Sequence, residues 1–159
     1  MSCDVAIAAF LVFAQAGPSA SMPPPAAAIA DAAPASVAGE PLFKDIVGRA
    51  STLKDQVDAY RKSLAASSEA VTLPRFSQFS EAITELSLLD QKGHEVLVAR
   101  GSKDDLKCIL HGISQDLPAK LAAVAAAKTG HDQDAALRDM SYLLRDNVEV
   151  ITAPPQPAA

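Results

Sequence analysis

Tryptophan is absent from this 159-residue chain, and aromatic residues make up only 4% of it. Sites that bind carbohydrates or bases commonly use stacked aromatic side chains, so this shortage argues against both. The net charge of −5 offers no electrostatic attraction for a nucleic-acid backbone. We therefore expect no nucleic-acid partner.

Glycine is also scarce, with seven residues, and no stretch alternates between apolar and polar residues as a strand would. Alanine, the strongest helix former, dominates instead. The sequence contains neither a nucleophile elbow nor a glycine-rich phosphate loop, so we do not expect an enzyme. The length suits one domain, and the expected fold class is all-α.

The first residues resemble a secretory signal peptide. Residues 5–14 (VAIAAFLVFA) form an apolar run too short to span a bilayer well, and Ala14-Gln15-Ala16 follows as a small-x-small cleavage pattern. Asp4 and the lack of a preceding Lys or Arg are atypical. We expect residues 1–16 to be cleaved, giving a periplasmic protein with no stable membrane insertion. The alternative is an uncleaved apolar leader or anchor.

Two further segments lack the apolar residues that a core requires. Residues 17–40 contain five prolines among alanine and serine and are expected to form an extended linker. Residues 153–159 are rich in proline and alanine and are expected to be a disordered tail. The folded domain is therefore expected to cover residues 41–152.

That domain contains four segments in which apolar residues recur three or four apart, as on one face of a helix. The turns near residues 100–102 and 129–131 are short, and a longer loop lies near residues 66–73. Short turns make neighbouring helices antiparallel, so we expect an up-down-up-down four-helix bundle. The expected core positions are Leu42, Ile46, Leu53, Val57, Tyr60 and Leu64; Phe76, Phe79, Ile83, Leu86, Leu89 and Leu97; Leu106, Leu110, Ile113, Leu117, Leu121 and Val124; and Leu137, Met140, Leu144, Val148 and Ile151.

Local signals suggest where these helices begin and end. Thr72 is expected to cap the second helix, and Gly101 to end it. Ser102 opens a segment resembling a capping box at the start of the third helix. Gly130 is expected to end that helix in the left-handed conformation, with Asp132 capping the fourth.

Several short features over about residues 42–151 are similar to one known family. They are His111-Gly112 before an amphipathic helix, the spacing from His111 to Gly130, Asp134 to Ala136, Thr52-Leu53-x-Asp55, and Asn147. Together they resemble soluble periplasmic cytochrome b562. The resemblance implies a four-helix bundle that binds haem b and transfers electrons.

The haem ligands of that family, a methionine on the first helix and a histidine near the end of the fourth, fall on Ala50 and Val150. Neither side chain has a donor atom for iron. Asp146 stands where the family has a basic residue. We therefore expect no cofactor; haem b is the alternative if other residues ligate it.

One other group could bind a metal. In an up-down bundle, His94, Cys108 and His111 come to the same end, and a Cys/His set suits copper or zinc. The alternative is that these residues lie off the apolar stripes, on the surface of different helices.

The leading interpretation is an exported bundle resembling cytochrome b562, without its haem ligation, that has a binding or structural role. A first alternative is a haem-binding periplasmic electron-transfer protein. A second is a module that binds a small apolar ligand or a protein partner, using a gap in the core near Ala50.

Overall fold

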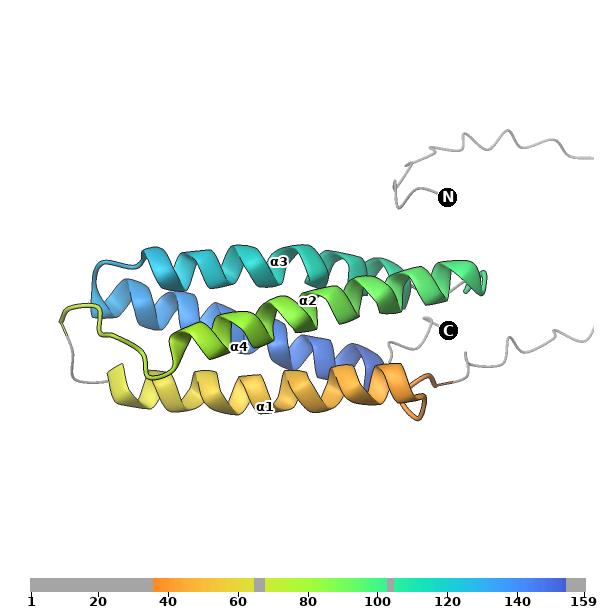
Figure 1. Ribbon diagram of the computed structural model, residues 1–159, viewed down its shortest axis with the longest axis horizontal. Helices are drawn as coiled ribbons and strands as arrows, with labels where there is room; N and C mark the ends of the chain where they lie inside the picture. The colour runs from red at the N-terminus through yellow and green to blue at the C-terminus, as the bar shows by residue number, and fades with distance from the viewer. Residues whose placement is uncertain (1–35, 65–67, 103–104, 154–159) are drawn as a thin grey trace, which may run out of the picture. The chain divides into compact units, whose positions relative to one another are not determined.

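The computed structural model describes residues 36–64, 68–102 and 105–153. The expected signal peptide, most of the expected linker and residues 154–159 of the expected tail lie outside these ranges. Four helices follow one another: α1 (Pro41–Leu64), α2 (Phe76–Ala99), α3 (Leu106–Ala126) and α4 (Gly130–Thr152) (Figure 1). The described residues contain no strand beyond an isolated bridge between Glu69 and Thr129, so the all-α prediction is confirmed.

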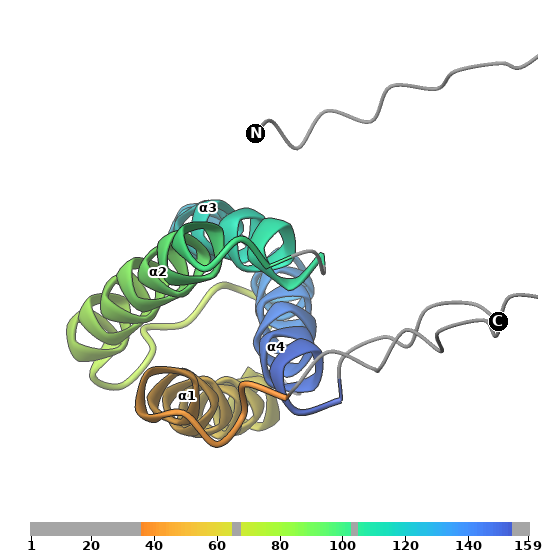
Figure 2. The same ribbon diagram turned by 90° about the vertical axis from the view of Figure 1, so that its right-hand side faces the viewer.

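Consecutive helices run antiparallel, which confirms the predicted up-down-up-down bundle (Figure 1). Viewed along its axis, the bundle has α1 beside α4 and α2 beside α3, and these two pairs make the most extensive interfaces (Figure 2). The α3–α4 interface is smaller, and the α1–α2 interface is the smallest of the four. Helices α2 and α4 face each other diagonally across the core.

The core follows the spacing of three and four residues that the sequence predicts, with some differences in its members. Phe43, rather than Leu42, is the first fully buried residue of α1. In α2 and α4 the buried stripes pass through Asp90, Gly93 and Asn147, none of which is a large apolar residue. The fully buried large side chains are Phe43, Phe79, Ile46, Ile83, Leu86, Leu97, Leu110, Leu117, Leu137, Met140, Leu144 and Ile151.

The end of α2 agrees with the prediction for Gly101. This glycine has φ 68°, and its N–H donates to the carbonyl of Val98 at 3.0 Å. The N–H of Ser102 donates to the carbonyl of Leu97 at 3.1 Å. These two bonds and the left-handed residue form a Schellman motif, which satisfies carbonyls that the helix end would leave unpaired.

The other predicted helix boundaries were wrong in detail. Gly130 does not end α3; it is the first residue of α4. Thr129 caps α4, with its hydroxyl oxygen accepting from the N–H of Asp132 at 3.1 Å. Thr129 takes this role because it is the extended residue just before the helix, whereas Asp132 already lies in the first turn. Helix α3 begins after Asp105, whose side chain makes no capping bond.

Thr72 does not cap α2, which begins later, after Arg75 in the left-handed conformation (φ 53°) and without a side-chain cap. The connection before it is extended and is fixed by contacts with distant residues. The Gln133 amide of α4 donates to the carbonyl of Val71 and accepts from its N–H, both at 2.9 Å. The Tyr60 hydroxyl of α1 donates to the carbonyl of Pro74 at 2.7 Å.

The last residues of the expected linker belong to the folded bundle. Val37 and Ala38 are partly buried against the core. Glu40 accepts two hydrogen bonds from the guanidinium of Arg100, both at 2.7 Å. Bidentate pairing of this kind fixes geometry, and here it joins the start of α1 to the end of α2.

Candidate functional site

The bundle has two ends, which differ in how their interiors are filled. The proximal end contains the start of α1, the end of α2, the start of α3 and the end of α4. The distal end contains the opposite termini and the connection before α2 (Figure 1). The sequence places every candidate ligand nearer the proximal end.

Ala50 and Val150, which the resemblance to cytochrome b562 would align with the haem ligands, lie in the core and beside it. Ala50 has 0% exposure, and Val150 is partly buried against the core. Ile46 and Ile151, two of the expected core positions, are also fully buried. Under that alignment, both positions carry hydrocarbon side chains, which have no donor atom for iron.

Gly93 reveals how tightly the proximal core is packed. A Cβ atom at this position would lie 3.1 Å from Cδ1 of Leu110, 3.4 Å from Cε1 of Phe43 and 3.5 Å from Cδ1 of Ile46. Side chains from two helices, α1 and α3, therefore pack into the space beside a residue of α2 that has no side chain. The sequence indicates that Gly93 is buried, because residue 93 continues the spacing of buried positions from Leu86 to Leu97.

The proximal half of the core also contains an acid–amide pair, Asp90 and Asn147, that the sequence analysis missed as a site. Both side chains have 0% exposure, and Nδ2 of Asn147 donates to Oδ2 of Asp90 at 2.8 Å. The remaining oxygen of each group, Oδ1 in both residues, is buried without a hydrogen-bond partner. Orphaned oxygens of this kind are rare, because each costs about 1–3 kcal/mol of desolvation.

Burial changes the acidity of this carboxyl group. Removal from water disfavours the charged form and raises the pKa of Asp90 to about 7, although the Asn147 hydrogen bond acts in the opposite direction. No charged neighbour contributes to this shift in pKa. Asp90 is thus the one strongly perturbed group in the bundle interior among the described residues.

His94 and His111 lie close together, as their predicted placement at one end of the bundle indicates. Both are half-buried, so they are not separate surface residues. Their rings face each other across the α2–α3 interface, with centroids 4.8 Å apart and planes inclined by 32°. Nδ1 of His94 donates to the carbonyl of Lys107 at 2.6 Å, and Nδ1 of His111 to Oε1 of Gln91 at 3.0 Å. In the neutral form both rings therefore carry their lone pair on Nε2, which for His111 lies 3.0 Å from the amide nitrogen of Gln115.

Cys108 does not complete a metal site with these histidines. It is half-buried at the start of α3 and has no free thiol. Within residues 36–64, 68–102 and 105–153, no group of three or more His, Cys, Asp or Glu side chains is arranged to hold a metal ion. His94 and His111 are oriented by hydrogen bonds, as metal-binding histidines commonly are. Among the described residues they lack the further ligands that a structural metal site would have.

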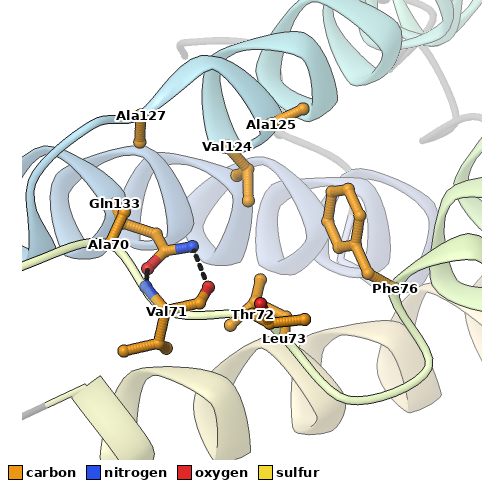
Figure 3. Close-up of a pocket in the computed structure, with 9 residues that line it drawn as sticks. All are labelled: Ala70, Val71, Thr72, Leu73, Phe76, Val124, Ala125, Ala127 and Gln133. Carbon is orange, nitrogen blue, oxygen red and sulfur yellow. Dashed lines mark hydrogen bonds between the residues drawn. The ribbon is translucent and has the colours of Figure 1, made fainter.

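A hollow of about 260 Å³ lies at the distal end (Figure 3). Its floor is the extended connection before α2, and its walls come from the end of α3 and the start of α4. The lining residues are Ala70, Val71, Thr72, Leu73, Phe76, Val124, Ala125, Ala127 and Gln133. The Gln133 amide is occupied by Val71, so apolar side chains and Thr72 remain to contact a ligand.

Surface ion pairs connect α1 to its neighbouring helices. Arg49 of α1 contacts Glu85 of α2 at 2.8 Å, and Arg61 of α1 contacts Asp134 of α4 at 2.9 Å. Exposed pairs of this kind contribute little stability. None of the four helices in the described chain is long and apolar enough to cross a membrane.

Comparison with known proteins adds no relative. No protein-family model matches the chain, and neither curated proteins nor solved structures give a match. The resemblance to cytochrome b562 therefore stays a prediction, based on the residues named above.

Proposed function

We propose that this chain is an exported, non-enzymatic four-helix bundle with a binding or structural role, and that it does not hold haem as cytochrome b562 does. The observation that supports this proposal best is the packing of the proximal core. Phe43, Ile46 and Leu110 meet beside Gly93, and Ala50 offers no donor atom. A porphyrin would have to displace these fully buried side chains without gaining a bond to iron.

The electrostatics also disfavour haem. Haem propionates need solvent or basic partners, whereas Asp146 presents a carboxylate near the end of α4. Arg145, next to it in sequence, contacts Asp146 at 3.2 Å and Glu149 at 3.4 Å. The positive charge of Arg145 is thus already shared between two carboxylates.

A binding role has room at the distal end rather than near Ala50. The distal hollow is lined mainly by apolar side chains and is bounded by an extended segment of backbone. A volume of about 260 Å³ suits a small apolar molecule and is just below the usual range for ligand pockets. We favour such a ligand over one bound beside Ala50.

Titration of haemin into the purified protein tests the central part of this proposal. We expect a broad, weak change in the Soret band, typical of haemin that is not ligated at a defined site. The control is a variant with both His94→Ala and His111→Ala. A sharp Soret shift with the split visible bands of a low-spin, six-coordinate haem, present in both proteins, would overturn the assignment of Ala50 and Val150.

Export is tested separately, by mass spectrometry of the protein recovered from the periplasm of an expressing cell. We expect an N-terminus at or near Gly17. A product in the cytoplasm that retains residues 1–16 would contradict the proposed export and leave the haem result unaffected.

A further inference from the structure

The Asp90–Asn147 pair has too few protons to give each of its buried oxygens a hydrogen bond. If Asp90 is ionised, the pair has one hydrogen bond, and Oδ1 of Asp90 and Oδ1 of Asn147 are both acceptors with nothing to accept. Exchanging the oxygen and nitrogen of the Asn147 amide leaves the same shortage. One additional proton between the two groups resolves it, because a carboxylic acid can donate and accept at once.

We propose that Asp90 is a neutral carboxylic acid in the folded bundle, with its proton on Oδ1 donated to Oδ1 of Asn147. The pair then forms a ring with two hydrogen bonds, one in each direction, and both orphaned oxygens are satisfied. No charge remains in the centre of the core. At pH values between the unfolded and the folded pKa of Asp90, folding thus takes up one proton from solvent.

The position of the pair gives this proton a structural consequence. Asp90 belongs to α2 and Asn147 to α4, the two helices that face each other diagonally. Loss of the proton would place a carboxylate in a site with 0% exposure, between helices that share no other extensive interface. The bundle is therefore expected to loosen as the pH rises above neutrality.

Other charged groups of the neighbouring helices lie toward the outside. Asp45 and Arg49 of α1 are exposed and paired with each other. On α3, Lys107 donates to the carbonyl of Ser102, and His111 is hydrogen-bonded to Gln91. On α4, the charged residues near Asn147 are exposed; they are Arg145, Asp146 and Glu149.

The wild type and an Asp90 variant have the same other titratable side chains, including His94 and His111. Any pH dependence that they cause is common to the wild type and to an Asp90 variant. The comparison between these two proteins therefore isolates the contribution of Asp90.

The first experiment is an NMR titration of the side-chain carboxyl carbons in the wild-type protein. We expect the Asp90 signal to change near pH 7, the range to which burial raises its pKa. Exposed aspartates titrate near pH 4 and serve as internal references. An Asp90 signal that titrates with them would overturn the proposal, and would indicate an ionised group satisfied by an enclosed water or cation.

The second experiment compares urea unfolding of the wild type and Asp90→Asn at about pH 5 and about pH 8.5. With a pKa of about 7 in the folded state and 3.8 unfolded, the wild-type unfolding constant should rise about a hundredfold between these pH values. Asparagine at position 90 can form the same ring of two hydrogen bonds without a titrating proton. The unfolding constant of the variant should therefore lack this hundredfold rise.

Asp55→Asn is the matched control, because it removes an exposed carboxylate from α1 and should leave the wild-type pH dependence unchanged. A pH dependence of Asp90→Asn equal to that of the wild type would contradict the proposal. If Asp90→Asn fails to fold, the NMR titration of the wild type still decides the question.

Discussion

Substitution of Gly93 tests the packing on which the assignment of a closed proximal end depends. Glycine in a helix interior is about 1 kcal/mol less favourable than alanine, so replacing it normally stabilises the helix. Gly48 in α1 should behave in this way, because an added Cβ there would meet nothing within 4 Å. Gly93→Ala should not, since the new methyl group would lie 3.1 Å from Cδ1 of Leu110.

The magnitude follows from two opposing effects. The gain in helix propensity is about 1 kcal/mol, and overpacking a filled core costs about 1–3 kcal/mol. Leu110 has 0% exposure and must move by a few tenths of an ångström against Phe43 and Ile46. We expect Gly48→Ala to raise the free energy of unfolding by about 0.5–1 kcal/mol, and Gly93→Ala to lower it by up to about 2 kcal/mol.

Urea denaturation followed by circular dichroism measures both changes, with Gly112→Ala as a second open-space control in α3. Combining Gly93→Ala with Leu110→Ala should give a smaller loss than the sum of the two, because the contact that opposes the new methyl group is removed. If Gly93→Ala stabilises the protein as much as Gly48→Ala, the core beside Gly93 has room for a further methyl group, and its packing does not exclude a cofactor there.

Two further predictions concern single side chains. Gln133→Ala removes both hydrogen bonds to the Val71 backbone and should lower the free energy of unfolding by about 1–3 kcal/mol; faster hydrogen exchange of the Val71 amide would locate the effect. The hydrogen bond from Lys54 is the main cause that lowers the pKa of Asp58, so its stabilising contribution is present above the unfolded value of 3.8 and is lost as the pH falls through the folded value. Asp58→Asn should therefore reduce the loss of stability below about pH 4, measured as the urea midpoint, and a wild-type acid dependence in this variant would contradict the assignment.

The sequence predicts the four helices well because their periodicity is local and strong. The spacing of residues such as Ile46, Leu53 and Val57 is enough to predict α1. The short turn at Gly101 then makes α2 and α3, the helices on either side of it, antiparallel. Residue type predicts Thr72 as a cap, but the connection in which it lies is fixed by Tyr60 of α1 and Gln133 of α4. Contacts between distant residues leave no local signal, so this part was not predictable.

The candidate site was missed for a different reason. Asp90 and Gly93 continue the spacing from Leu86 to Leu97, and Asn147 continues the spacing from Leu144 to Ile151. None of the three is a large apolar residue, so the hydrophobic pattern does not include them. Spacing alone would have marked them as buried. Likewise, sequence places His94 and His111 at one end, but only the packing of α2 on α3 turns their rings toward each other.

A buried acid–amide pair is not the most stable choice for this position. A well-packed apolar pair of similar volume would commonly stabilise a core as much or more. The polar pair instead fixes the register of α4 relative to α2. If α4 shifts along α2 by one turn, Asp90 meets Leu144 or Ile151, neither of which can donate or accept, and a carboxyl group is left buried and unpaired at a cost of several kcal/mol. Because α2 and α4 share no extensive interface of their own, this pair links them directly, and it does so through two hydrogen bonds only while Asp90 holds its proton.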